Sequence, residues 1–173
     1  MIIVLIGYMG SGKSTVGKRL AATLNANFID LDTAIENREG SSVSELFRAK
    51  GEIYFRRKEN EILKNLIENI ATGVIATGGG TPCYADTMPW LLQRKDVTTV
   101  YLKTSLELLT KRLYAERASR PLIEHLQDAD TLQDFIRKHL FERSYYYRQA
   151  SLVIDTSEKD IATIVEEIIL KLF

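Results

Sequence analysis

The chain has 173 residues, which is enough for one domain with a sizeable hydrophobic core. Its 23 basic and 23 acidic residues balance, so no net positive field attracts nucleic acid or an anionic membrane. The sole cysteine, Cys83, excludes an internal disulfide and a cysteine-rich metal site, and it fits a reducing cytoplasm. We therefore expect a cytoplasmic monomer without nucleic-acid or membrane partners, whose anion sites are local clusters of cations.

The first predicted element is a strand over residues 2–6, a continuous apolar run rich in β-branched residues. Such runs are typical of strands that are covered on both faces of a parallel sheet. The run is too short for a membrane span and lacks the basic leader of a signal peptide, so we expect neither. A glycine-rich turn over 7–12 and a helix over 13–24 follow it.

Strands and helices alternate along the rest of the chain. The further strands are predicted at 28–31, 74–76, 98–102 and 152–154, and the further helices at 52–69, 86–94, 105–114, 131–149 and 160–172. This alternation predicts an α/β fold, a three-layer α/β/α sandwich with a mainly parallel five-stranded sheet.

Two polar, irregular segments interrupt the pattern, at roughly 33–60 and 115–127. Within the first, Ser42 and Glu45 have the spacing of a helix capping box. No linker or repeat separates either segment from its neighbours. We therefore expect both to be mobile flaps on a single domain that spans residues 1–173.

The turn after the first strand carries a phosphate-binding motif. Gly7–Ser14 matches G-x-x-x-x-G-K-[ST] in full, between an apolar strand and an amphipathic helix. Its glycines let backbone N–H groups turn toward phosphate oxygens, and the helix N-terminus adds positive potential at the same place. Lys13 can then reach the outer phosphates, and the Ser14 hydroxyl can ligate Mg²⁺. The motif identifies a P-loop but does not say which molecule receives the phosphate.

An acidic pair, Asp30 and Asp32, follows the second strand. Ligands of parallel sheets bind beyond the carboxyl ends of the strands, so both acids should lie near the bound phosphates. One acid could orient Mg²⁺ through water, and the other could hold an acceptor hydroxyl. The alternative is a solvated strand end, or a cap for a helix over 33–38.

Two further features suggest a ligand site. Arg56 and Arg57 stand together at a predicted helix start, where cations oppose the helix dipole; pairing with Glu52 and Glu59 on the surface is the alternative. Three consecutive glycines at 78–80 forfeit about 2–3 kcal/mol of backbone entropy relative to alanines. A tight turn needs only one glycine, so the surplus suggests close approach of a ligand, with a flexible turn as the alternative.

Taken together, the motifs closely resemble the shikimate kinase family. The resembling elements occur in family order and cover roughly residues 2–155: Gly7–Thr15, Asp30–Asp32, Gly51–Glu52, Phe55–Arg57, Gly78–Gly80, Arg120–Pro121, and Arg143 with Tyr147. A P-loop alone is shared by very many nucleotide-binding proteins. The acidic pair, the Phe-Arg-Arg segment and the triple glycine together are far more specific.

The resemblance implies a nucleoside monophosphate kinase-like fold and ATP- and Mg²⁺-dependent phosphorylation of the shikimate 3-hydroxyl, on the route to chorismate and aromatic amino acids. It implies that segment 33–60 is a substrate-binding flap and 115–127 a lid. It assigns to ATP the residues Gly10, Ser11, Gly12, Lys13, Ser14, Thr15, Arg112 and Arg120, with Arg112 stacking on adenine and Arg120 closing over the phosphates.

It assigns to shikimate the residues Asp32, Arg56, Gly78, Gly79, Gly80 and Arg143, and to Mg²⁺ and its waters Ser14 and Asp30. The residues implied in catalysis are Lys13, Asp32 and Arg120. Two arginines can grip the shikimate carboxylate and so present the hydroxyl to the γ-phosphate.

Two other interpretations remain open from the sequence. One is another small-metabolite P-loop kinase of the gluconate or nucleoside monophosphate type, which would share Lys13 and Ser14 but would not need Arg56, Arg143 and the triple glycine together. The other is a non-catalytic ATP-sensing module, which would bind ATP without turnover.

Overall fold

The five strands predicted from the sequence form one sheet. The computed structural model describes residues 1–120 and 122–173, so Pro121 of the Arg120–Pro121 motif lies outside the described residues. The strands are β1 (Ile2–Ile6), β2 (Phe28–Asp30), β3 (Gly73–Ala76), β4 (Val97–Lys103) and β5 (Leu152–Asp155). They are hydrogen-bonded in the order β2-β3-β1-β4-β5, and each pairing is parallel.

Helices follow the strands as the alternating pattern predicts. They are α1 (Lys13–Thr23), α2 (Leu31–Glu39), α3 (Val43–Asn69), α4 (Thr87–Gln93), α5 (Leu106–Glu116), α6 (Ala129–Tyr147) and α7 (Ile161–Leu172), with 3₁₀ turns η1 (Thr81–Cys83) and η2 (Arg117–Ser119). None of the helices formed by the described residues is long and apolar enough to cross a membrane.

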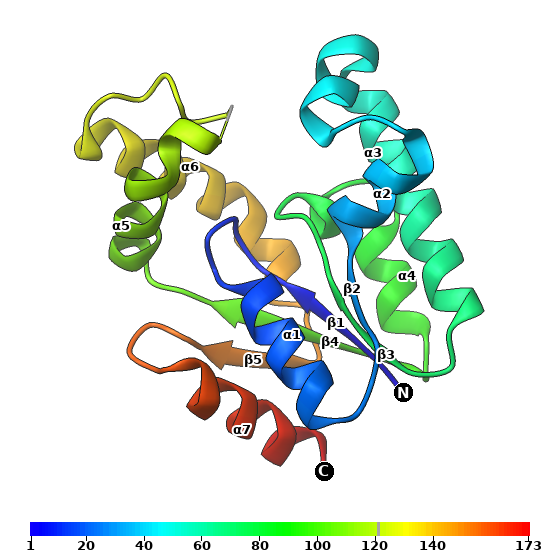
Figure 1. The fold of residues 1–173 in the computed structure, drawn as a ribbon. Helices are drawn as coiled ribbons and strands as arrows, with labels where there is room; N and C mark the ends of the chain where they lie inside the picture. Colours follow the sequence, from blue (N-terminus) through cyan, green and yellow to red (C-terminus); the bar gives the residue numbers. More distant parts are fainter. Residues whose placement is uncertain (121) are drawn as a thin grey trace.

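The helices cover both faces of the sheet and confirm the three-layer sandwich (Figure 1). Successive side chains of β1 point to opposite faces, and all five are buried. Ile3 and Leu5 pack with α1 and α7 in one apolar cluster. Ile2, Val4 and Ile6 pack in the other cluster, which includes buried residues of α2 to α6. The sheet is therefore buried on both sides, as its continuous apolar strands predict.

The strand order places the phosphate loop at the centre of the molecule. β1 lies between β3 and β4, where the chain switches from one side of the sheet to the other. In open α/β sheets ligands bind at this switch point, beyond the carboxyl ends of the strands. Figure 1 shows α2 and α3 rising on one side of the loop after β1, and α5 and α6 on the other.

The expectation that segment 33–60 is irregular is wrong. It is helical almost throughout, because α2 and α3 are each started by a local cap. Asp30 caps α2, and the predicted capping box of Ser42 and Glu45 is present at the start of α3. Gly51, at φ 80° and ψ 170°, interrupts α3 just before the arginine pair. The segment looks irregular in sequence because few of its side chains are buried.

Candidate active site

The phosphate loop is shaped by glycines that adopt left-handed backbone conformations. Gly7 has φ 149°, and a Cβ there would lie 2.9 Å from the carbonyl oxygen of Leu102. Gly12, at φ 91°, sits at the start of α1, so the helix N-terminus faces into the loop. The Ser11 hydroxyl is buried and has no hydrogen-bond partner among the described residues. A buried group of this kind calls for a ligand, and a phosphate oxygen fits it.

Lys13 is held inside this loop with its charge only partly balanced. Its ammonium group donates to the carbonyl oxygens of Gly7 and Tyr8 at 2.8 and 2.9 Å. Burial lowers the pKa of Lys13 to about 8, against the opposing effect of the Asp32 carboxylate. A polyphosphate would supply the missing negative charge. The donors present in the loop therefore fit the phosphates of a nucleotide.

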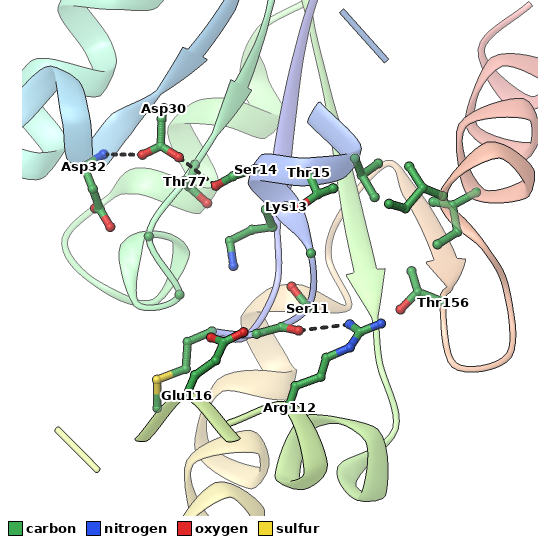
Figure 2. Close-up of a pocket in the computed structure, with 18 of the residues that line it drawn as sticks. Ser11, Lys13, Ser14, Thr15, Asp30, Asp32, Thr77, Arg112, Glu116 and Thr156 are labelled. Atoms are coloured by element: carbon green, nitrogen blue, oxygen red, sulfur yellow. Dashed lines mark hydrogen bonds between the residues drawn. The ribbon is translucent and has the colours of Figure 1, made fainter. Parts of the chain in front are cut away.

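A cavity of about 690 Å³ opens at this loop and brings most of the predicted site together (Figure 2). The predicted residues that line it are Gly10, Ser11, Gly12, Lys13, Ser14, Thr15, Asp30, Asp32, Gly78, Gly79, Arg112 and Arg120. Thr156 and Lys159, from the segment between β5 and α7, also line it and were not found from the sequence. Arg56, Gly80 and Arg143 are not among its lining residues.

Asp30 serves both as a helix cap and as a partner of the phosphate loop. One carboxylate oxygen accepts from the backbone N–H of Asp32 at 3.1 Å and of Thr33 at 3.4 Å. The other accepts from the Ser14 hydroxyl at 2.7 Å. Figure 2 shows Asp30 between Asp32 and Ser14. Paired hydroxyl and carboxylate oxygens are hard ligands that fit Mg²⁺.

These two oxygens would not bind a metal alone. Among the described residues no three His, Cys, Asp or Glu side chains are grouped for metal binding. Mg²⁺ keeps much of its hydration shell and takes its remaining ligands from phosphates, so the pair is sufficient for that mode of binding.

Asp32 is a carboxyl group with a strongly perturbed pKa. Burial raises its pKa to about 6, and the neighbouring carboxylates of Glu59 and Asp30 add to the effect, against the opposing charge of Lys13. It is therefore ionised at neutral pH, yet it accepts a proton more readily than an ordinary aspartate. This property suits a group that holds an acceptor hydroxyl.

Arg56 is fixed against the glycine turn. Its NH1 donates to Glu59 Oε2 at 2.9 Å, and its Nε donates to Glu52 Oε1 at 3.3 Å. A Cβ on Gly80 would lie 2.6 Å from Arg56 NH2. The surplus glycines were expected to allow close approach of a ligand, but at Gly80 the group that approaches the backbone is the guanidinium of Arg56.

Glu59 is a site residue that sequence reasoning missed. Only 2% of it is exposed, and it accepts from Thr81 Oγ1 at 2.6 Å as well as from Arg56. The alternative of a surface pair with Arg56 is therefore wrong for Glu59. The signal lay in its spacing: Glu59 is four residues from both Phe55 and Leu63 on the buried stripe of α3.

Arg143 reaches the same turn from α6. A Cβ on Gly79 would lie 3.6 Å from Arg143 NH1, and the Tyr147 hydroxyl donates to the Gly79 carbonyl oxygen at 2.5 Å. The charges of Arg143 and Arg56 both act on Cys83, although burial dominates and raises the pKa of that thiol to about 11. Arg143 also lowers the pKa of Lys13. The two guanidinium groups therefore converge on the glycine turn beside the phosphate loop.

The remaining predicted cations lie on the other side of the cavity. Arg112 NH1 donates to the carbonyl oxygen of Gly10 at 3.0 Å, and Figure 2 shows its guanidinium on the same side as Thr156. Arg120 pairs with Glu116, through Nε at 3.0 Å and NH2 at 2.5 Å. Its charge also lowers the pKa of Lys13. Arg120 thus stands near the phosphate loop while paired with Glu116, the last residue of α5.

The chain has a P-loop kinase fold with an acceptor site. The phosphate loop lies at the switch point of the sheet, with an acidic pair beside it and two guanidinium groups across from it. The family model described as shikimate kinase matches residues 9–173. A shikimate kinase of Flavobacterium johnsoniae is 43% identical over 167 residues, which cover 96% of each chain.

Solved structures agree with the sequence comparison. The shikimate kinase structure from Bacteroides thetaiotaomicron has a TM-score of 0.90 at 36% identity and covers 99% of this chain and 98% of its own. The structure of a shikimate kinase from Acinetobacter baumannii in complex with shikimate has a TM-score of 0.86 at 35% identity. The match covers 99% of this chain and 92% of that chain. The chain belongs to the shikimate kinase family.

Proposed function

We propose that the protein transfers the γ-phosphoryl group of ATP to the 3-hydroxyl of shikimate and forms shikimate 3-phosphate and ADP. The observation that carries the proposal is the convergence of Arg56 and Arg143 on the glycine turn beside the phosphate loop. Guanidinium groups bind carboxylates with charge-assisted hydrogen bonds, and shikimate carries a carboxylate. A kinase for an acceptor without a carboxylate would not need this pair.

On the nucleotide side, Gly10 to Thr15 hold the phosphates, and Lys13 reaches the outer ones. Ser14 and Asp30, already joined at 2.7 Å, hold Mg²⁺ and its waters. When bound, Mg²⁺ neutralises negative charge on the transferring phosphoryl group. Arg112 stacks on the adenine ring, at the side of the cavity that Thr156 also lines.

On the acceptor side, Asp32 orients the hydroxyl and accepts its proton. Phosphoryl transfer has a loose transition state with little charge on the attacking oxygen, so positioning matters more than early proton removal. The glycine turn lets the acceptor ring lie close to the backbone of Gly78 and Gly79, while Arg56 and Arg143 hold its carboxylate.

Arg120 then closes over the phosphates. It exchanges its ion pair with Glu116 for phosphate oxygens, an exchange that costs little because both partners are partly exposed. Closure excludes water, which would otherwise compete with the acceptor hydroxyl.

A coupled assay of ADP release tests the proposal, with ATP, Mg²⁺ and a panel of acceptors: shikimate, its methyl ester, gluconate and nucleoside monophosphates. We expect efficient turnover of shikimate and at least about tenfold weaker use of the uncharged ester, the scale of one lost charge-assisted hydrogen bond. Faster turnover of gluconate or a nucleoside monophosphate would show that this compound, and not shikimate, is the substrate. Tight ATP binding without turnover of any acceptor would indicate a sensing module.

We also propose that the protein acts as a monomer in the cytoplasm, without nucleic-acid partners. Its zero net charge supports the absence of nucleic-acid partners. The residues proposed for both substrates come from one chain, so the site needs no second copy. Sedimentation equilibrium tests the oligomeric state, and a stable dimer at micromolar concentration would contradict this part.

A further inference from the structure

Tyr84 has no role in the site as described above, yet its ring covers Arg56. The guanidinium carbon of Arg56 lies 4.3 Å from the centroid of the Tyr84 ring. The rings of Phe55 and Phe47 lie farther from it, at 5.3 and 5.6 Å. A distance of 4.3 Å over the ring face is within the range of a cation–π contact. Among the rings of the described residues that stack on Arg56, that of Tyr84 is therefore the nearest.

The segment that carries Tyr84 is anchored to α3, the helix that carries Arg56. Hydrogen bonds join the two at several points. Thr81 Oγ1 donates to Glu59 Oε1 at 2.6 Å, Lys64 Nζ donates to both carboxylate oxygens of Asp86 at 2.8 Å, and Asn60 Nδ2 donates to Thr87 Oγ1 at 2.7 Å and to Asp86 Oδ1 at 3.3 Å. They lie on both sides of Tyr84 in the sequence, so the ring is held over the helix from both ends.

The backbone next to Tyr84 is strained. Ala85 has φ 51°, in the left-handed region that a residue with a Cβ rarely adopts. Such outliers persist where the surrounding contacts enforce them, and they collect at binding sites. Here the hydrogen bonds to α3 hold the turn, and the turn places the ring on the guanidinium.

The stack restrains Arg56 without using its hydrogen-bond donors. Glu59 and Glu52 take NH1 and Nε, and the Gly80 backbone lies against the guanidinium. A third carboxylate would fix the group too, but it would compete with the substrate for the remaining N–H groups. A neutral ring does not compete, and burial together with the Glu52 carboxylate raises the pKa of Tyr84, so it stays neutral.

We propose that Tyr84 is a positioning residue that fixes the guanidinium of Arg56 with a free N–H edge toward the acceptor's carboxylate. The inference rests on the proposed function and adds to it a determinant of affinity for carboxylate-bearing acceptors. The charges of Arg56 and Arg143 both act on the Tyr84 hydroxyl, so the ring lies near both guanidinium groups of the acceptor site.

The test is steady-state kinetics of Tyr84→Phe, Tyr84→Leu and a series with fluorinated phenylalanines at position 84. Fluorination weakens the negative potential of the ring face and keeps its shape, so folding is not at issue in that series. We expect Tyr84→Phe within about twofold of wild type, and Tyr84→Leu with a KM for shikimate raised about tenfold and an unchanged KM for ATP. Along the fluorinated series the KM for shikimate should rise with each added fluorine.

Tyr54→Leu is the matched control, because Tyr54 makes a similar stack with Lys50 at 4.4 Å on the same helix, away from the glycine turn. Its KM for shikimate should not change. A flat response across the fluorinated series, or equal rises in the KM for shikimate and for ATP in Tyr84→Leu, would overturn the inference. Wild-type protein that fails to phosphorylate shikimate would instead refute the proposed function.

Discussion

Arg56 on α3 and Arg120 in the lid are held in opposite ways. Arg56 pairs with a carboxylate that is 2% exposed, stacks on a tyrosine ring and fills the space that a side chain at Gly80 would take. Arg120 is bound by Glu116 alone among the contacts described above, and their side chains are 34% and 50% exposed. Buried pairs are costly to break, whereas exposed pairs contribute about 0–1 kcal/mol. The acceptor side is therefore preorganised, and the lid is free to exchange partners.

This difference predicts which kinetic constant each region controls. Substitutions in the phosphate loop or the acceptor site, which form the fixed region, should lower the rate of phosphoryl transfer or the affinity for one substrate. Changes in the lid should alter turnover and leave the affinities almost unchanged, because the lid arginine contacts the phosphates only after closure.

The largest effect should come from the fixed phosphate loop. Lys13→Ala removes a buried ammonium group, and turnover should fall at least 100-fold, on the order of the 3–4 kcal/mol attributed to one well-placed stabilising group. Lys18→Ala, an exposed lysine on the same helix, is the control and should retain wild-type turnover. Quenched-flow or coupled assays at saturating ATP measure both. Unchanged turnover in Lys13→Ala would remove this residue from the mechanism.

Arg120→Ala should have the next largest effect, and it tests the lid directly. Turnover should fall about 10- to 100-fold, while calorimetric affinities for ATP and shikimate stay within about threefold of wild type. Arg137→Ala is the control, since Arg137 forms a comparable exposed pair with Asp134 on α6. If Arg120→Ala turns over at the normal rate, another residue supplies the closing cation.

The local features of this site could be predicted from sequence, and the long-range ones could not. The P-loop, its strand and its helix are contiguous, so Gly7–Ser14 carries the whole signal. Arg56 and Arg143 stand 87 positions apart in the numbering and meet only through packing on the glycine turn, so only the family resemblance suggested that they act together.

Two of the residues that were missed share a physical reason. Glu59 and Tyr84 act through Arg56, and a supporting contact leaves no motif in the sequence. Glu59 could have been found as a charge on a buried helical stripe. Tyr84 could not, because its position depends on the left-handed turn at Ala85. The helical structure of 33–51 was missed because the chain there is polar, and only the helix caps signal it.

Arg143→Ala should weaken shikimate and leave ATP almost unaffected. Loss of one charge-assisted contact to a carboxylate costs about 1.5–3 kcal/mol, which corresponds to a KM for shikimate raised about 10- to 100-fold. Arg148→Ala, an exposed arginine just after α6, is the control. Titration of each variant with shikimate and with ATP separates the two affinities. A collapse of ATP binding with intact shikimate binding would mean that the two sites are assigned in reverse.

The smallest effects concern pH. Asp32 must be ionised to accept the hydroxyl proton, so kcat/KM should fall as the pH drops below about 6, the value to which its pKa is raised. Lys13 must be protonated to bind phosphates, so kcat/KM for ATP should fall above about pH 8, to which burial lowers its pKa. In the pH profile of kcat, the fall at high pH should occur at a higher pH than in the profile of kcat/KM, because bound phosphates favour the charged form of Lys13.

Glu59→Gln sharpens this prediction, because Glu59 is the carboxylate that raises the pKa of Asp32 most, ahead of Asp30 and Glu36. Removing its charge should move the acid limb of kcat/KM to lower pH and leave the basic limb in place. The same change removes the charge that holds Arg56, so the KM for shikimate should rise at every pH. Only the pH at which the acid limb of kcat/KM falls reports on Asp32. The variant Glu36→Gln removes another carboxylate that contributes less to this pKa, and it should move the limb by less. An acid limb that stays fixed in Glu59→Gln would show that a group other than Asp32 titrates there.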